Sequence, residues 1–175
     1  NAQQDLIAGL AQYRDSLLAL LDKLAFAPQA RVLEVGPGDG SFLPDLAQRF
    51  AHVTAMDNSP AMLELARKLC ERQGLDNVEL RLADALGDAK VQADCVVLNM
   101  VLHHFAAPAD ALGQLAEHLQ PGGSLLVTDL CSHDQSWARE ACGDLWLRFE
   151  QEDLARWAIA AGLVPAASRY VCLRH

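Results

Sequence analysis

A carboxylate precedes three alternating glycines near the start of the chain, in the pattern E-x-G-x-G-x-G. The residues are Glu34, Gly36, Pro37, Gly38 and Gly40. Glycine adopts backbone conformations that other residues avoid, so this spacing indicates a tight turn that lets a ligand approach the main chain closely. Turns that bind dinucleotides instead use G-x-G-x-x-G, with a pyrophosphate at the N-terminus of the following helix. A carboxylate beside the turn would repel a pyrophosphate and attract an amino group, so the pattern favours a phosphate-free nucleoside.

S-adenosylmethionine (SAM) has the chemistry that such a turn requires, because it carries an amino group and a sulfonium cation and no phosphate. We therefore predict SAM as the cofactor. The alternative is an ordinary strand-to-helix turn, in which three glycines would cost backbone entropy for no structural gain.

The glycine turn lies within a repeating order of strands and helices. Hydrophobic patterns predict strands at residues 32–35, 53–56, 78–82, 95–98, 124–129 and 163–173. Helical spacing, prolines and glycines predict helices at residues 5–25, 42–50, 60–73, 108–119, 134–142 and 150–161, with Pro121–Gly123 ending the fourth. This alternation predicts an α/β fold with a doubly wound, mostly parallel sheet.

Polar residues follow the predicted strands at the edge where a doubly wound sheet binds its ligands. Asp57 ends the second strand and can accept hydrogen bonds from both ribose hydroxyls, with Asn58 and Met62 counted beside it as cofactor-binding residues. Asp84 and Ala85 follow the third strand. The carboxylate can accept from the adenine amino group, and the small neighbour leaves room for the ring.

The fourth strand ends at Asn99 and Met100, where Asn99 can hold the methionine part of the ligand. Each strand end alone is weak support, because Asp57 also suits a helix N-terminus and Asp84 also suits a turn. Together the strand ends place suitable groups on one rim of one sheet.

Two histidines, His103 and His104, follow the fourth strand, near where a methyl acceptor would enter. Either can serve as a general base or orient the substrate. The alternative is that one packs beside Phe105 and the other is solvated.

Four residues after the fifth predicted strand can line an acceptor pocket, or they can belong to a capped helix with buried indoles. They are His133, Asp134, Trp137 and Trp146. Cys131 has no clustered thiols or histidines in sequence, so we predict no metal site.

Composition limits the classes of partner. A net charge of −9 argues against contact with nucleic acid by these residues. Five scattered cysteines without a C-x-x-C pair indicate reduced thiols and a cytoplasmic protein. No apolar run reaches the length of a membrane span.

We expect a single domain over residues 1–175, with a helical cap (1–27), a cofactor-binding core (28–130) and a substrate-side segment (131–175). The start at Asn1 indicates a domain cut from a longer protein.

The residues above resemble the class I SAM-dependent methyltransferases over residues 28–130, including the Leu119–Gly123 turn before the fifth strand. The resemblance implies strand order 3-2-1-4-5-7-6 with an antiparallel seventh strand, which this chain does not reach. It also implies that the glycine turn wraps the methionine moiety, that Asp57 binds the ribose and that Asp84 binds the adenine amino group.

A second resemblance lies after the fifth strand. Residues 133–140 and 144–150 resemble the methyltransferase domains found behind arsenical-repressor-like winged-helix domains in bacteria, although Arg148 replaces the glycine of their W-L-G-F motif. This resemblance leaves open an upstream winged-helix domain and a homodimer. The expected function is SAM-dependent methyl transfer to a small molecule. The alternatives are a non-catalytic domain that senses SAM or S-adenosylhomocysteine, and an NAD-dependent oxidoreductase, which the carboxylate and the glycine spacing disfavour.

Overall fold

The computed structural model describes residues 2–87, 90–129 and 149–166 of the chain. It divides into two compact units, residues 1–26 with 166–175 and residues 27–165. The first unit contains the helix α1 (Ala2–Lys23). The second contains the sheet and the candidate site.

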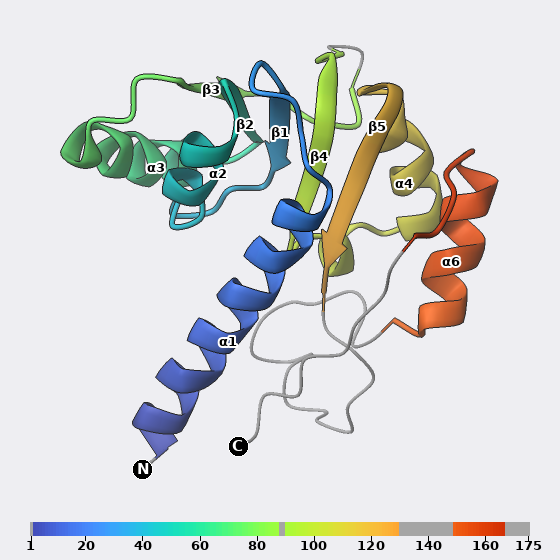
Figure 1. Cartoon of the computed structure of the whole chain (residues 1–175), viewed down its shortest axis with the longest axis horizontal. Helices are drawn as coiled ribbons and strands as arrows, with labels where there is room; N and C mark the ends of the chain where they lie inside the picture. The colour runs from blue at the N-terminus through green and yellow to red at the C-terminus, as the bar shows by residue number, and fades with distance from the viewer. Residues whose placement is uncertain (1, 88–89, 130–148, 167–175) are drawn as a thin grey trace. The chain divides into compact units, whose positions relative to one another are not determined.

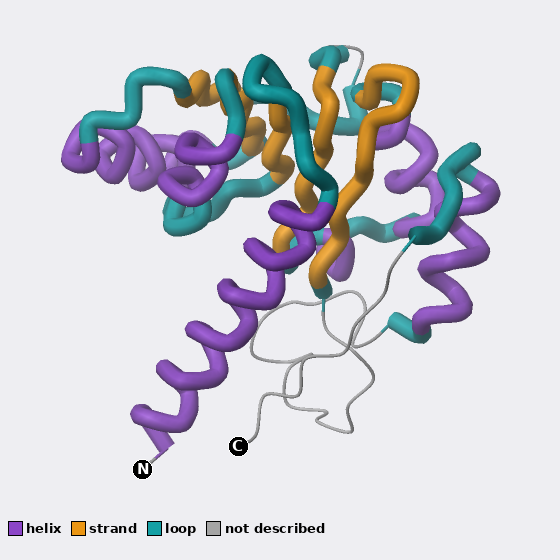
Figure 2. The backbone as a smooth tube through the Cα atoms, viewed as in Figure 1, coloured by secondary structure: helices purple, strands orange, loops and turns teal. Residues whose placement is uncertain are grey.

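Five parallel strands form the sheet, in the order β3-β2-β1-β4-β5 (Figures 1 and 2). They are β1 (Arg31–Val35), β2 (His52–Asp57), β3 (Val78–Leu82), β4 (Ala93–Asn99) and β5 (Leu119–Thr128). The predicted fold class and strand order are confirmed for these strands. Because β1 lies in the middle, the chain steps outward first through β2 and β3 and then through β4 and β5.

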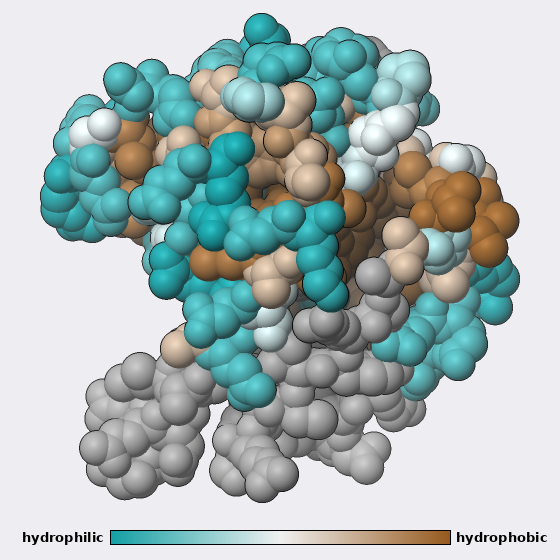
Figure 3. Space-filling view, in the orientation of Figure 1, coloured by the Kyte–Doolittle hydropathy of each residue, from teal (hydrophilic) through white to brown (hydrophobic). Residues whose placement is uncertain are grey.

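Helices connect the strands. They are α2 (Leu43–Arg49), α3 (Pro60–Gln73), the short 3₁₀ helix η1 (Leu102–His104), α4 (Pro108–Ala116) and α6 (Gln151–Ala160). Connections between parallel strands are right-handed. The steps from β1 to β2 and β3 run in the opposite direction to the step from β4 to β5, so α2 and α3 lie on one face of the sheet and α4 on the other. The outward side of α3 is mostly hydrophilic, whereas hydrophobic residues gather over the C-terminal end of α6 and the loop after it (Figure 3), where Ile159 and Val164 are exposed.

Local sequence explains where α3 begins and ends. Ser59 caps its N-terminus by accepting a hydrogen bond from Met62 N–H, and Pro60 occupies the first turn, where no backbone donor is needed. Gly74 ends it in the left-handed conformation, at φ +65°. These signals predicted its bounds correctly.

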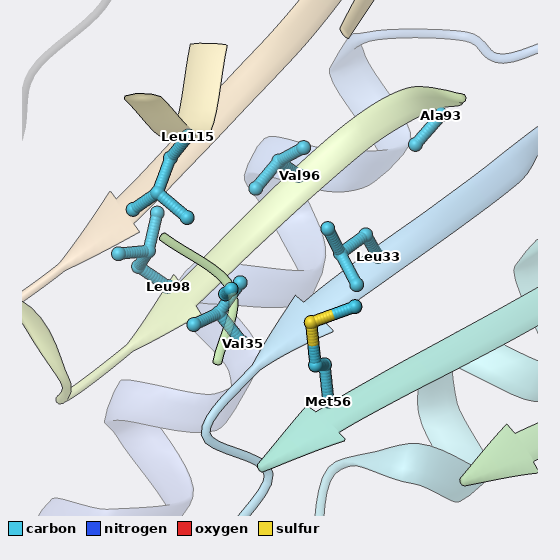
Figure 4. Packing of buried hydrophobic residues seen from close by; sticks show 8 residues of the cluster. Leu33, Val35, Met56, Ala93, Val96, Leu98 and Leu115 are labelled. Atoms are coloured by element: carbon cyan, nitrogen blue, oxygen red, sulfur yellow. The ribbon is translucent and has the colours of Figure 1, made fainter. Parts of the chain in front are cut away.

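The core beneath the α4 face consists of side chains that alternate along the central strands (Figure 4). Leu33 and Val35 of β1 pack with Met56 of β2 and with Val96 and Leu98 of β4. The β1–β4 register pairs Leu33 with Val96 and Val35 with Leu98, so these residues share one face. Continuous apolar strands of this kind are expected in a parallel sheet covered on both faces.

Two sequence predictions in this part of the chain were wrong. The fourth predicted helix stops at Ala116 and not at 119, and Pro121–Gly123 lie inside β5 and not before it. The register explains the difference, because Ala93 pairs with Leu119 whereas Cys95 pairs with Ser124. The extra residues of β5 are accommodated as an irregularity, with Gly122 at φ +80°.

The described residues include only part of the elements predicted after β5. Residues 163–166 of the predicted sixth strand are not in a strand, and the rest of that strand lies outside the described residues. The predicted helix at 134–142 also lies outside them. No helix among the described residues has the length and apolar character needed to cross a membrane.

Candidate active site at the carboxyl ends of the strands

Glu34 is a buried carboxylic acid in the middle of the sheet. Its relative exposure is 2%, and its neighbours in register are Ala55 of β2 and Val97 of β4. Its Oε2 atom has no hydrogen-bond partner in the described structure. Burial, together with the negative charge of Asp39, raises the pKa of Glu34 to about 8. A buried carboxyl group with one unpartnered oxygen is suited to receive a cationic group from a ligand.

The predicted glycine turn follows directly, and all three glycines have positive φ: +66° at Gly36, +57° at Gly38 and +81° at Gly40. Gly36 N–H donates to Met56 O at 2.8 Å, which ties the turn to β2. A Cβ at Gly36 would lie 2.9 Å from a Val101 methyl group. These positions therefore favour glycine for conformation, and Gly36 also requires it for packing.

The glycines of the turn differ in the free space around them, and the open position is where a ligand can approach. A Cβ at Gly40 would lie 2.9 Å from the Ala66 backbone, so this glycine seats the turn against α3. A Cβ at Gly38 would meet nothing within 4 Å. Pro37, between the first two glycines, is buried. The middle of the turn thus presents its main chain to open space.

The ends of β2 and β3 each carry an oriented carboxylate. Asp57 Oδ1 accepts from Ser59 N–H at 2.8 Å, and Asp84 Oδ1 accepts from Leu86 N–H at 2.9 Å. An ionised carboxylate has about four acceptor positions, so one local bond orients the group and leaves capacity for a ligand. Asn58 beside Asp57 is exposed, and Ala85 beside Asp84 is buried.

Met62, also predicted to bind the cofactor, is half-buried in the first turn of α3.

The end of β4 is held by β5. Thr128 Oγ1 donates to Asn99 Oδ1 at 2.9 Å, and Met100 N–H donates to Thr128 O at 2.9 Å. Met100 has φ +58°, a conformation that costs a non-glycine residue about 1–2 kcal/mol. Backbone strain of this kind tends to occur at functional sites, where the surrounding structure maintains it. Here the strained residue lies on the predicted rim.

His103 forms a buried pair with an aspartate that sequence reasoning did not select. Asp129 Oδ1 lies 2.8 Å from His103 Nδ1, and Asp129 Oδ2 accepts from His103 N–H at 3.2 Å. The side chains are 7% and 2% exposed. A carboxylate accepting from Nδ1–H leaves Nε2 as the basic nitrogen of a neutral imidazole. His104 differs: it is exposed, with its ring centroid 4.0 Å from that of His103.

A family model described as "Methyltransferase domain" matches residues 8–167, which is most of the chain. The chain belongs to this methyltransferase family. The curated relatives of this methyltransferase domain include a ribosomal protein L11 methyltransferase from Symbiobacterium thermophilum, 32% identical over 69% of this chain and 38% of that protein. They also include a ubiquinone biosynthesis O-methyltransferase from Xylella fastidiosa, 35% identical over 58% of this chain and 42% of that protein. The chain therefore spans less than half the length of these relatives.

Solved structures support the fold of the methyltransferase domain. One is phosphoethanolamine N-methyltransferase 2 from Haemonchus contortus in complex with S-adenosyl-L-methionine. It superimposes with a TM-score of 0.71 at 20% identity, covering 85% of this chain and 36% of that chain. At this identity the likeness concerns the fold alone.

The structure brings most of the predicted residues of the methyltransferase domain to one rim and leaves some untested. The ends of four strands, β1 to β4, contribute these residues, because the strands are parallel. The predicted acceptor-pocket residues His133, Asp134, Trp137 and Trp146 lie outside the described residues, as does Cys131. The described residues contain no cluster of three or more histidine, cysteine or acidic side chains that could hold a metal ion.

Sequence reasoning missed Asp129 and Asp39. Asp129 follows β5 at the same rim, so the argument that selected Asp57 and Asp84 would have found it. Asp39 lies inside the glycine turn, where its charge acts on Glu34 and its Oδ1 accepts from Ser41 N–H at 3.0 Å.

Proposed function

We propose that this methyltransferase domain binds SAM at the carboxyl rim and transfers its methyl group to a small molecule. The observation that carries the proposal is Glu34, a buried acid with an unpartnered oxygen beneath an open glycine turn. That arrangement fits an amino acid with a cationic amino group and does not fit a pyrophosphate. The site residues therefore suit SAM by their own chemistry.

Each part of the cofactor has a chemically suitable residue. Glu34 would accept from the amino group, and the main chain of Gly36–Gly40 would lie along the methionine moiety. Asp57, with Asn58 and Met62 beside it, would bind the ribose, and Asp84 with Ala85 would bind the adenine. Asn99 and Met100 would complete the site from β4. When bound, SAM supplies an electrophilic methyl group that is already activated by its sulfonium.

The role of the protein is then to position the acceptor and, where the acceptor must lose a proton, to take that proton. His103 is suited to this task, because Asp129 holds its Nδ1 and orients the ring. His104 is exposed beside it and is suited to contact the acceptor. We infer a small-molecule acceptor and a cytoplasmic location; the buried, unpaired Cys70 and Cys95 agree with the latter.

The resemblance to domains of winged-helix regulators supports a second candidate function, which is sensing of SAM without turnover. The upstream winged-helix domain and the homodimer also stay predictions. The His103–Asp129 pair favours catalysis, since a sensor needs no oriented base at the rim.

Calorimetric titration with SAM, S-adenosylhomocysteine and NAD tests the cofactor. We expect the two adenosyl compounds to bind and NAD not to bind, and NAD binding more tightly than SAM would refute the proposal. A panel of small-molecule acceptors with labelled SAM then tests turnover. Tight SAM binding without methyl transfer to any member of a broad panel would favour the sensor.

A further inference from the structure

His118 is a fully buried histidine that bonds through both ring nitrogens to a distant part of the main chain. It lies between α4 and β5, and its relative exposure is 0%. Nδ1 lies 3.0 Å from Val91 N, and Nε2 lies 2.8 Å from Ala85 O. An N–H group can only donate and a carbonyl can only accept. The two partners therefore fix the neutral tautomer with its proton on Nε2.

The two partners belong to the connection between β3 and β4. Ala85 is in the turn after β3, and Val91 is close before β4, on either side of residues 88–89, which lie outside the described structure. Ala85 is buried in the same cluster as Ala93 and Leu115. One imidazole thus ties the turn after β3 to the segment that enters β4. Removing it would leave a buried carbonyl and an N–H without these partners.

The turn that His118 holds contains Asp84, the residue we assign to the adenine. Ala83 N–H donates to Asp57 O at 3.0 Å, which holds the residue before Asp84. His118 holds the residue after it. The bonds that Asp84 itself makes, from Leu86 N–H to Oδ1 and from Gly87 N–H to the backbone O, lie within the turn. They shape the turn, whereas Ala83 attaches it to β2 and His118 attaches it to the connection between α4 and β5.

We propose that His118 is a positioning residue for the nucleobase end of the cofactor. The inference rests on the proposed function, because it assumes that Asp84 and Ala85 receive the adenine. His118 does not touch the ligand and acts through Ala85. If the turn is ordered only part of the time, the apparent dissociation constant rises by the inverse of the ordered fraction. A turn in its binding form about one-tenth of the time would bind about tenfold more weakly.

Three variants separate this role from a general loss of stability. His118→Leu removes both bonds. His118→Gln restores them in part, because a carboxamide has an acceptor oxygen and a donor NH₂ group in place of the two ring nitrogens. Val53→Ala is the control: Val53 is fully buried in β2, and its truncation weakens the core without touching either bond. All are compared at a temperature where each is folded by circular dichroism.

The probes are S-adenosylhomocysteine and 5′-methylthioadenosine, which share the adenosine but differ in the amino acid. We expect His118→Leu to weaken binding of both by about the same factor, on the order of tenfold. We expect His118→Gln to recover most of the affinity and Val53→Ala to bind both probes normally. Glu34→Gln gives the opposite pattern, because it should weaken S-adenosylhomocysteine alone.

The outcomes distinguish the two proposals. If the unmodified protein binds neither probe, the proposed function fails and this inference fails with it. If it binds both and His118→Leu binds them as well as Val53→Ala does, the positioning role is wrong and the proposed function stands. Nitrogen NMR of the unmodified protein gives a check that needs no variant to fold. It should show His118 neutral with its proton on Nε2, and a proton on Nδ1 would overturn the inference.

Discussion

Replacing Glu34 by glutamine tests the central feature of the site, because it removes the charge and nearly preserves the shape. The pKa of Glu34 is raised to about 8 in the folded protein, from an ordinary value of 4.5. Between these two values the folded state holds a proton that the unfolded state releases. Stability from this group is therefore fully present below about pH 4.5 and is lost as the pH rises through about 8.

The size of the effect follows from the pKa difference. Each pH unit above 4.5 costs about 1.4 kcal/mol until the folded-state pKa is reached. Keeping Glu34 buried therefore costs the empty protein about 3 kcal/mol at pH 7 and only about 1 kcal/mol at pH 5. Glutamine does not ionise, so the Glu34→Gln variant lacks this dependence. Its amide can introduce a constant offset of about 1–3 kcal/mol if its N–H groups lack partners, but the offset does not vary with pH.

The assay is urea unfolding of the empty protein at several pH values from 5 to 8. Relative to the parent, the variant should gain about 2.5 kcal/mol in free energy of unfolding between pH 5 and pH 7. Glu64→Gln is a suitable control. The Glu64 carboxylate is bonded to Arg67 and Lys68, which lower its pKa, so it stays ionised over this range and its replacement should give a difference without this slope.

Ligand binding gives the second half of the prediction. If the amino group of the cofactor pairs with ionised Glu34, binding must release close to one proton at pH 7, and affinity should rise toward pH 8. Calorimetry in buffers of different ionisation enthalpy measures this release, and the variant should show none. Parallel stability curves for the two proteins from pH 5 to pH 8 would refute the reasoning, because Glu34 would then be ionised when the site is empty.

Other substitutions test the rest of the rim. Asp57→Ala and Gly38→Arg should each abolish SAM binding in calorimetry while the circular dichroism spectrum stays unchanged; unchanged affinity in either would mean that the rim is wrongly assigned. Gly36→Ala should destabilise the fold by about 1–3 kcal/mol in urea unfolding, because its Cβ would lie 2.9 Å from a valine methyl group at positive φ. If His103 is the base, Asp129→Asn should lower kcat by about tenfold or more and change KM less. An unchanged kcat would show that His103 does not act as the base.

Much of the fold follows from local signals in the sequence. The bounds of α3 were predictable because Ser59, Pro60 and Gly74 each act within a few residues of the helix end. The start of β5 was not, because Pro121 and two glycines normally end an element. Pairing with β4 overrides that preference here, through a register shift that only the partner strand determines.

The site divides in the same way. Glu34, the glycines and the polar residues at the strand ends were selected because each is adjacent in sequence to a recognisable strand. The pairing of His103 with Asp129 and the bonds of His118 to Ala85 and Val91 join residues far apart in sequence. Such bonds leave no periodic pattern, and a lone histidine has several unrelated structural uses.

The central position of β1 has a consequence for the order in which the protein is made. The glycine turn emerges from the ribosome early, but it is seated between Met56 on one side and Val101, beyond β4, on the other. A nascent chain that ends before β4 therefore has an incomplete turn, and pairing of β1 with β4 must close a long loop. Ligand added during refolding should act late, by trapping chains in which β4 has already docked. Variants that slow β4 docking should accordingly gain yield from the ligand, whereas variants that damage the turn should not.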